Sequence, residues 1–373
     1  MIQTEIPTPQ KKEGQSQDDD PPLVKNENPA EWNDWHWQIR NSITTLEELS
    51  KYITLTDIEK QSGSLPLRIT PYYAQLLTNP AIRKCVVPSA RELAVSSCEE
   101  VDSLAEERDR KTEHIIHRYP DRVLFLTTNI CASNCRYCTR SRLVDNNEHS
   151  ISNRWEESFE YIKNHPEVRD VLLSGGDPLL LSDAQIDYLL QRLYEIPTVE
   201  MVRIGTKVPV VLPQRITDNL IKVLSKYDPL YISIHFTHPA EITTETTTAC
   251  KRLAKEAHAL LGSQTVCLSG VNDSEEILGT LFKKLLTISV RPYYAYACDL
   301  VPGSSHFRVP LQKLIGIIEK LRGYISGYAI PQFVIDGPGG RGKTPILPDY
   351  FIGENGKDAL FKNYKGEKFI YPL

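Results

Sequence analysis

From Arg122 to about residue 323, short apolar segments alternate regularly with amphipathic stretches. The apolar segments have the length of buried strands, and the amphipathic stretches have the apolar spacing of helices. Six such strand-then-helix units follow one another along the chain. Strands joined through helices run parallel with right-handed crossovers. The alternation therefore predicts an α/β fold built on one parallel sheet.

Six units suit a partial (β/α)6 barrel better than a complete barrel of eight strands. Functional side chains are then expected at the carboxyl ends of the strands. The predicted strands cover residues 123–126, 171–173, 201–204, 230–234, 265–268 and 291–296. The predicted helices lie near residues 154–164, 183–194, 217–227, 244–260, 274–288 and 311–323.

The segments that flank these units differ in composition. Residues 1–29 are polar and rich in proline, so we expect a disordered tail. Residues 30–119 have helical patterning, and Thr45 and Glu48 have the spacing of a capping box. We therefore predict an N-terminal helical region, a barrel over residues 120–330, and a lysine loop with a short C-terminal extension over residues 331–373.

Composition excludes several classes of function. The formal net charge of −5 over 373 residues argues against a nucleic-acid partner. No apolar run approaches the roughly 18 residues of a membrane span, and the N-terminus lacks a signal-peptide pattern. Five cysteines are scattered without a pairing pattern, which favours reduced thiols. We therefore expect a cytoplasmic protein that binds neither nucleic acid nor membranes.

Three further cysteines, Cys131, Cys135 and Cys138, have the spacing C-x3-C-x2-C directly after the first predicted strand. Three thiolates can bind three irons of a [4Fe–4S] cluster and leave the fourth iron open to a small molecule. A structural zinc site usually needs a second cysteine pair or two histidines, and no second pair follows. The spacing favours the cluster, with zinc or unliganded thiols as alternatives.

The second predicted strand is followed by Gly175, Gly176 and Asp177. Two glycines allow close backbone approach, and exposed amides can bind the amine or carboxylate of a ligand. Gly-Gly-Asp alone is a common turn, but here it follows one strand after the cysteines. Together the two motifs resemble the radical S-adenosylmethionine superfamily. That resemblance implies that S-adenosyl-L-methionine binds the open iron and is cleaved to a radical when the reduced cluster gives it an electron.

The stretch Asp336–Lys343 is rich in glycine and ends in a lysine. Such a lysine can lie against a flat ligand and form a Schiff base with pyridoxal 5′-phosphate (PLP). The ordinary alternative is a solvated surface lysine, and the spacing does not fit a Walker A loop. Arg118 and Arg122 flank the entry to the first strand, where they can grip a phosphate or form a surface salt-bridge cluster.

Over about residues 30–365, the chain resembles the lysine 2,3-aminomutase family. The matching stretches include residues 29–35, 117–124, 138–140, 174–177, 208–217, 270–273, 291–294, 298–300, 326–328 and 336–343. The resemblance implies an isomerase that interconverts L-lysine and β-lysine by moving the amino group between neighbouring carbons. It also implies three cofactors: a [4Fe–4S] cluster, S-adenosyl-L-methionine and PLP.

The resemblance carries roles onto individual residues of this chain. It implies that Lys343 holds PLP and that Arg118, Tyr119 and Arg122 bind the phosphate of PLP. It also implies that Gln264 lies near S-adenosyl-L-methionine. For the substrate, it implies that Arg140 binds the carboxylate and that Asp299 and Asp336 hold the side-chain ammonium. A guanidinium suits a carboxylate, and two carboxylates suit one ammonium. A relative that acts on glutamate should lack the acid pair, because its substrate ends in an anion.

The chain also departs from the family pattern. Relatives of clostridial type bind zinc through C-terminal cysteines, whereas no cysteine follows Cys298 here and Ser274 stands at the barrel position. Arg341 interrupts the glycines before the lysine. The alternatives are a mutase for arginine or ornithine, β-lysine supply for modification of a translation factor, and a non-catalytic iron–sulfur protein. As partners we expect an amino-acid substrate, flavodoxin or ferredoxin as electron donor, and a second copy of the chain.

Overall fold

The structure is a computed structural model that describes residues 28–61, 65–145, 151–152 and 154–373. The predicted disordered tail lies outside the described residues, apart from Asn28 and Pro29. Asn28 caps the first short helix, and its side chain accepts a hydrogen bond from the amide of Ala30 at 3.1 Å.

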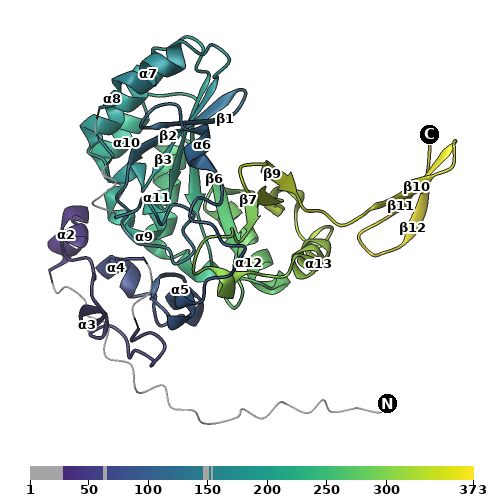
Figure 1. The fold of residues 1–373 in the computed structure, drawn as a ribbon, viewed down its shortest axis with the longest axis horizontal. Helices are drawn as coiled ribbons and strands as arrows, with labels where there is room; N and C mark the ends of the chain where they lie inside the picture. Colours follow the sequence, from purple (N-terminus) through teal and green to yellow (C-terminus); the bar gives the residue numbers. More distant parts are fainter. Residues whose placement is uncertain (1–27, 62–64, 146–150, 153) are drawn as a thin grey trace, which may run out of the picture.

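A nine-stranded sheet in the order β1 to β9 forms the centre of the molecule (Figure 1). All neighbouring strands from β2 to β8 are parallel. Their bounds are β2 Arg122–Thr128, β3 Asp170–Gly175, β4 Met201–Thr206, β5 Leu230–His235, β6 Leu260–Cys267, β7 Arg291–Ala297 and β8 Gln332–Gly337. The six predicted strands are therefore confirmed. The sheet also contains β8, and β6 begins at Leu260 rather than at Thr265.

Antiparallel strands close both edges of the sheet, which the sequence pattern did not predict. β1, Ile115–Tyr119, pairs with β2, and β9, Gly342–Pro345, pairs with β8. The predicted boundary at residue 120 thus falls inside the β1–β2 hairpin. Each edge strand is short and belongs to a tight hairpin, so periodicity over a longer window does not reveal it.

Helices connect the parallel strands and cover the outside of the curved sheet (Figure 1). They are α7 Glu156–Lys163, α8 Asp183–Tyr194, α10 Asp218–Leu224, α11 Thr244–Lys255, α12 Glu275–Thr287 and α13 Leu311–Leu321, and each overlaps a predicted helix. Shorter turns of helix are α9 Val208–Val211, η3 Pro178–Leu180, η4 Pro213–Arg215, η5 Pro239–Glu241, η6 Ser305–Phe307 and η7 Gly327–Ala329.

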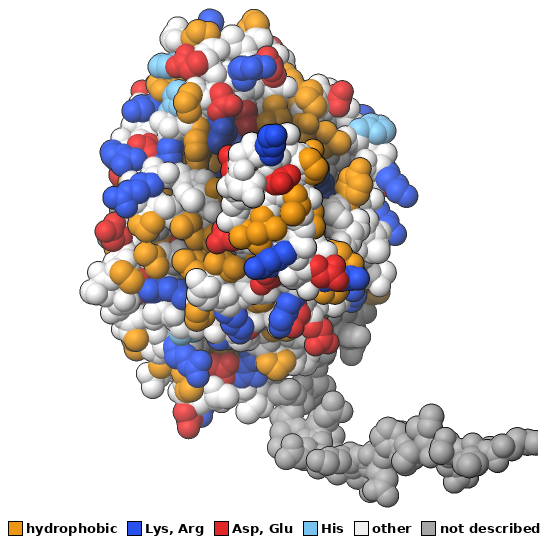
Figure 2. Space-filling view, turned by 90° about the vertical axis from the view of Figure 1, so that its right-hand side faces the viewer, with side chains coloured by type: hydrophobic (Ala, Val, Ile, Leu, Met, Phe, Trp, Pro, Cys, Tyr) orange, Lys and Arg blue, Asp and Glu red, His pale blue; other side chains and the backbone are white. Residues whose placement is uncertain are grey.

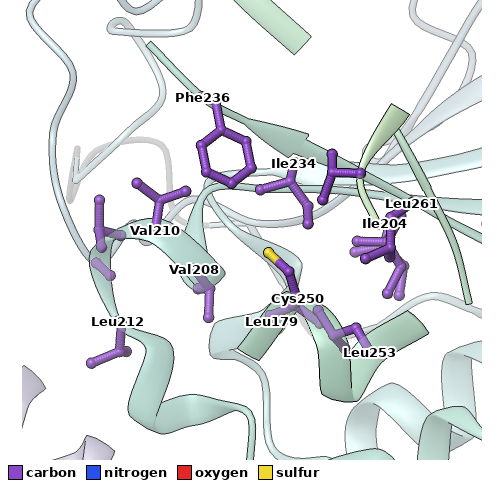
Figure 3. Close-up of a cluster of buried hydrophobic side chains, with 14 of the residues drawn as sticks. Leu179, Ile204, Val208, Val210, Leu212, Ile234, Phe236, Cys250, Leu253 and Leu261 are labelled. Carbon is purple, nitrogen blue, oxygen red and sulfur yellow. The ribbon is translucent and has the colours of Figure 1, made fainter. Parts of the chain in front are cut away.

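Successive residues of the strands face opposite sides of the sheet. On β4, Met201, Arg203 and Gly205 line the inner cavity, whereas Val202 and Ile204 are buried on the other side. Figure 3 shows this outer layer, where Ile204 and Ile234 of neighbouring strands lie near α11. Burial of each side chain of this size stabilises the fold by about 1.5–3 kcal/mol relative to leaving it exposed to water. The apolar layer between the strands and the helices therefore stabilises the sheet, and the inner face of the sheet can carry polar side chains.

The predicted helical N-terminal region contains short helices, and its last residues form β1. The helices are α1 Pro29–Trp32, α2 Trp35–Arg40, α3 Leu46–Leu49, α4 Pro71–Ala74, α5 Pro80–Val86, η1 Ala90–Leu93 and α6 Glu106–Asp109. The predicted capping box of Thr45 and Glu48 is confirmed at the start of α3. Proline in the first turn of α1, α4 and α5 fixes where those helices begin.

A small three-stranded antiparallel sheet ends the chain. It contains β10 Phe351–Glu354, β11 Asp358–Lys362 and β12 Lys368–Pro372, and it projects away from the barrel at the right of Figure 1. Within the part of the chain that the structure describes, no helix is long and apolar enough to cross a membrane.

Candidate active site

A cavity of about 1180 Å³ occupies the inside of the partial barrel. Strands from both edges of the sheet and the cysteine loop contribute to its wall. The predicted site residues that line it are Arg118, Tyr119, Arg122, Cys135, Cys138, Arg140, Gln264, Asp299, Asp336 and Lys343. Cys131, Gly175, Gly176 and Asp177 lie outside this lining. Positions spread over more than 200 residues thus meet in one space. Cys135, Cys138 and Asp299 follow the carboxyl ends of parallel strands, as expected, whereas Arg122 begins β2.

The cysteine loop is anchored by buried contacts on both sides of Cys135. The backbone amide of Asn134 donates to the carbonyl of Arg68 at 3.0 Å. Arg136 forms a buried ion pair with Glu92, and its Nη1 donates to the carbonyl of Leu65 at 2.8 Å. These contacts hold the loop in one conformation, as a preorganised ligand set requires.

The environment of the three thiols suits a metal cluster. Burial raises the pKa of Cys138 to about 11, and burial together with the neighbouring thiols raises that of Cys131 well above its usual value. The thiols therefore need a bound cation to ionise. No three His, Cys, Asp or Glu side chains among the described residues converge to hold a single metal ion. In a cluster each thiolate binds a different iron, so convergence on one point is not required.

The two glycines at the end of β3, Gly175 and Gly176, allow the strand to pass close to the cysteine loop. A Cβ atom at Gly175 would lie 2.1 Å from the carbonyl oxygen of Thr128, and one at Gly176 would lie 2.2 Å from that of Ile130. Gly176 donates its amide to Thr128 at 2.6 Å. The expected exposure of this amide to a ligand is thus incorrect, because it is used between strands. The glycines place β3 against the loop.

Asp177 has a similar internal role in the structure. Its buried carboxylate accepts hydrogen bonds from the hydroxyl of Thr206 at 2.7 Å and from the amides of Lys207 at 2.7 Å and Val208 at 3.1 Å. It also accepts the amide of Leu179 at 3.1 Å. These bonds tie the end of β3 to the end of β4, so the carboxylate shapes the rim of the barrel.

The predicted phosphate-binding residues belong to the β1–β2 hairpin. Arg118 is on β1, where its Nε lies 2.7 Å from Oδ2 of Asp109. Tyr119 and Arg122 are directly opposite across the hairpin, and the Arg122 guanidinium lies 3.8 Å from the centre of the Tyr119 ring. Two guanidiniums and a phenol at one end of the cavity have the chemistry to bind a phosphate.

Lys343 and Asp336 face each other across the β8–β9 hairpin. The Lys343 ammonium lies 3.0 Å and 3.2 Å from the two carboxylate oxygens of Asp336. The amide of Lys343 donates to the Tyr119 hydroxyl at 3.1 Å, which connects the hairpin to the phosphate-binding residues. The predicted lysine loop is thus a hairpin, and Arg341 is exposed near its turn.

Asp299 follows β7 and lies near Asp336 and Lys343. Burial is the main cause that raises its pKa to about 7, and the charge of Asp336 adds to the effect, while Lys343 and Arg140 oppose it. A neutral or strained carboxyl next to a second acid is the arrangement that a bound ammonium relieves. The cavity therefore has an acidic end suited to a cation.

Arg140 also lines the cavity, two residues beyond the last cysteine. Its guanidinium contacts Glu106, with Nη2 2.8 Å from Oε1, and its Nη1 donates to the Ser174 hydroxyl at 3.3 Å. Sequence analysis missed Glu106, the first residue of the short helix α6, because a single buried acid has no motif. It also missed Tyr296, whose ring centre lies 5.4 Å from the Lys343 ammonium.

Tyr137 in the cysteine loop is tied to the end of β5. Its hydroxyl lies 2.9 Å from Nε2 of His235 and 2.9 Å from the hydroxyl of Thr237. Burial lowers the pKa of His235 to about 3, so this ring is neutral at physiological pH. The strand ends and the cysteine loop are thus connected by side chains as well as by backbone.

Comparison with known proteins places the chain in a family. Residues 125–281 match the Radical SAM superfamily, and residues 318–372 match Lysine-2,3-aminomutase. The L-lysine 2,3-aminomutase of Clostridium subterminale is 48% identical over 354 residues, which cover 92% of this chain and 85% of that protein. The chain belongs to the lysine 2,3-aminomutase family.

Other members of the lysine 2,3-aminomutase family show its range. The L-lysine 2,3-aminomutase of Bacillus subtilis is 43% identical over 94% of this chain and 76% of its own length. The glutamate 2,3-aminomutase of Clostridioides difficile is 39% identical over 92% of this chain and 83% of its own length. The predicted family and the predicted radical SAM partial barrel are thus confirmed. The substrate has to be argued from the residues of the cavity.

Proposed function

We propose that the protein is a PLP-dependent lysine 2,3-aminomutase that interconverts L-lysine and β-lysine. One observation carries the choice of substrate: Asp299 and Asp336 line the same cavity as Arg140. Free lysine has a carboxylate at one end and an ammonium at the other. The guanidinium can pair with this carboxylate and the two acids with this ammonium, whereas the distal carboxylate of glutamate would meet the acid pair.

Each part of the cavity has a role in this proposal. Cys131, Cys135 and Cys138 would hold the cluster, and Gln264 would contact S-adenosyl-L-methionine. Lys343 would hold PLP, and Arg118, Tyr119 and Arg122 would bind its phosphate. When bound, these groups supply the one-electron chemistry and the carrier for the migrating amino group. The Arg140 guanidinium binds the substrate carboxylate, and Asp299 and Asp336 bind its distal ammonium.

The enclosing barrel contributes by position and by exclusion of water. The substrate is held at both ends, so the carbons between which the amino group moves are fixed relative to the cofactors. The walls also keep solvent from reactive species. Gly175, Gly176 and Asp177 act indirectly in this scheme, because they place the strand ends around the cysteine loop.

The activity is tested by an anaerobic assay with reductant, S-adenosyl-L-methionine and each of lysine, arginine, ornithine and glutamate. We expect turnover of lysine and little turnover of glutamate. Comparable turnover of glutamate would contradict the roles of Asp299 and Asp336. Preferential turnover of arginine or ornithine would keep the chemistry and change the substrate.

Absorbance distinguishes the enzyme from a non-catalytic iron–sulfur protein. The purified protein should be brown and have the visible band of a PLP Schiff base. The Lys343→Ala variant should lack that band and should still contain iron. Lys362→Ala is the matched control, because Lys362 pairs with Glu319 in the C-terminal part of the chain. A protein with iron and no PLP would contradict the proposal.

The proposal extends to partners and location. The cluster needs one electron for each cleavage of S-adenosyl-L-methionine, so we propose reduced flavodoxin or ferredoxin as donor and a reducing cytoplasm as location. The projecting C-terminal sheet exposes Phe369, Ile370 and Tyr371, and Figure 2 shows grouped hydrophobic side chains on the side toward which it extends. Exposed apolar strands favour association, and we propose a homo-oligomer. Sedimentation of the full chain tests this.

A further inference from the structure

Glu106 makes the most extensive buried contact with Arg140. Nε of Arg140 lies 2.9 Å from Oε1 and 3.2 Å from Oε2 of Glu106, and Nη2 lies 2.8 Å from Oε1. The carboxylate also accepts a hydrogen bond from Nη2 of Arg142 at 3.1 Å. Only 3% of Glu106 is exposed, so this is a buried carboxylate shared by two guanidiniums.

The backbone before Glu106 is shaped to direct its side chain toward the cavity. Ala105 has a φ of 52°, in the left-handed region that residues with a Cβ seldom adopt. The carboxylate of Asp102 accepts the amides of Glu106 and Glu107, each at 2.9 Å. A strained residue persists only where its surroundings determine it, and such residues cluster at functional sites.

These contacts divide the guanidinium of Arg140 into two edges. The edge with Nε and Nη2 contacts Glu106, and Nη1 contacts the hydroxyl of Ser174. A guanidinium has five N–H groups in a rigid plane, so two fixed contacts set the direction of its remaining donors. Burial alone would favour a neutral Glu106, but Arg140 and Arg142 outweigh it and lower its pKa.

The segment around Glu106 also contacts the other two parts of the site. Asp109 pairs with Arg118, the predicted phosphate ligand, at 2.7 Å. Arg108 donates to the carbonyl of Gly339 at 2.9 Å, and Gly339 donates its amide to the carbonyl of Ser103 at 2.9 Å. The short helix α6 and the residues just before it thus contact the cysteine loop, the phosphate-binding residues and the lysine hairpin.

We infer that Glu106 is a positioning residue that aims Arg140 at the carboxylate of the substrate. It acts through Arg140, with Ser174 as a weaker second contact. The inference rests on the proposed function, because that function makes Arg140 the carboxylate ligand. It goes further in naming an acid of the N-terminal region as part of amino-acid recognition.

The test uses Glu106→Gln, which keeps the side-chain shape and removes its charge. Calorimetry on the PLP-loaded enzyme compares binding of lysine with binding of 1,5-diaminopentane, which is lysine without its carboxylate. We expect the Kd for lysine to rise about tenfold relative to that for the diamine, the loss typical of a misdirected charged hydrogen bond. Glu107→Gln is the control, because it removes a neighbouring charge that contacts Arg110 and Arg142 instead of Arg140.

The outcomes separate this inference from the proposed function. An equal change for both ligands, or no change, overturns the positioning role. Binding of lysine that depends on Glu106 without any turnover supports the role and counts against the aminomutase activity. If the unsubstituted enzyme turns over lysine and Glu106→Gln leaves lysine binding unchanged, the aminomutase activity is supported and the positioning role is overturned. If Glu106→Gln does not fold, Ser174→Ala decides, and it should weaken lysine binding more than diamine binding.

Discussion

The ammonium of Lys343 lies within hydrogen-bond distance of both carboxylate oxygens of Asp336, at 3.0 Å and 3.2 Å. Under the proposed function, this lysine occupies the place intended for the distal ammonium of the substrate. Two cations therefore use one carboxylate in turn. If Lys343 held PLP through its amine, Asp336 would lose this partner and could accept the ammonium of the substrate.

Substitution of Asp336 should affect substrate binding more than radical initiation. We expect Asp336→Asn to raise the KM for lysine about tenfold or more, because one buried charge partner of the ammonium is lost. Cleavage of S-adenosyl-L-methionine should persist, as measured by release of 5′-deoxyadenosine. Asp358→Asn, in the C-terminal sheet, is the control. Loss of iron in the Asp336 variant would indicate a structural role instead.

The raised pKa of Asp299 predicts a pH-dependent stability. Its pKa is about 7 in the folded protein, against 3.8 for an ordinary aspartate. The folded state therefore keeps a proton that the unfolded state releases between about pH 4 and pH 7, and stability falls as pH rises through that window. Asp299→Asn should raise the free energy of unfolding by at least about 1 kcal/mol at about pH 8. At about pH 4 the difference should vanish.

Denaturant unfolding of the parent and of the Asp299→Asn variant, both without PLP, measures the difference in their free energies of unfolding at each pH. The low-pH arm serves as the control for any change in packing. A gain of the same size at both pH values would show that the substitution acts through packing and not through the proton.

The cysteine loop should account for the bound iron. Cys138→Ala removes a ligand that lines the cavity and should abolish the cluster absorbance and most of the iron, measured by chemical analysis after anaerobic reconstitution. Cys98→Ala is the matched control, because Cys98 is an exposed thiol that contacts Arg308. Retention of a full complement of iron in the Cys138 variant would contradict the cluster assignment.

Gly176 should tolerate no side chain. An alanine there would place its Cβ 2.2 Å from the carbonyl of Ile130, so the cysteine loop has to move. We expect a loss of about 2 kcal/mol or more in stability and a reduced iron content. Gly316→Ala provides the contrast, since nothing lies within 4 Å of its Cβ position in α13, and it should stabilise by about 0.5–1 kcal/mol. Equal effects of the two substitutions would refute the close-approach role.

Local patterns predicted the elements well and their edges less well. The strand-then-helix rhythm identified the parallel strands β2 to β7 because buried strands and amphipathic helices differ in period. β1 and β9 were missed because short edge strands have little period of their own. The predicted amide exposure at Gly176 failed because the partner of a backbone group depends on its neighbouring strand.

The sequence by itself determined the chemistry available to this protein: three thiols on one loop, a glycine-flanked lysine, and the acids and arginines of the family pattern. These are local or co-linear features. The tertiary structure decided which of them meet, since Lys343 opposes Asp336 through strand register and Arg140 is held by Glu106 across the fold. Contacts between distant residues depend on how the sheet curls and packs, and no single-sequence period encodes that.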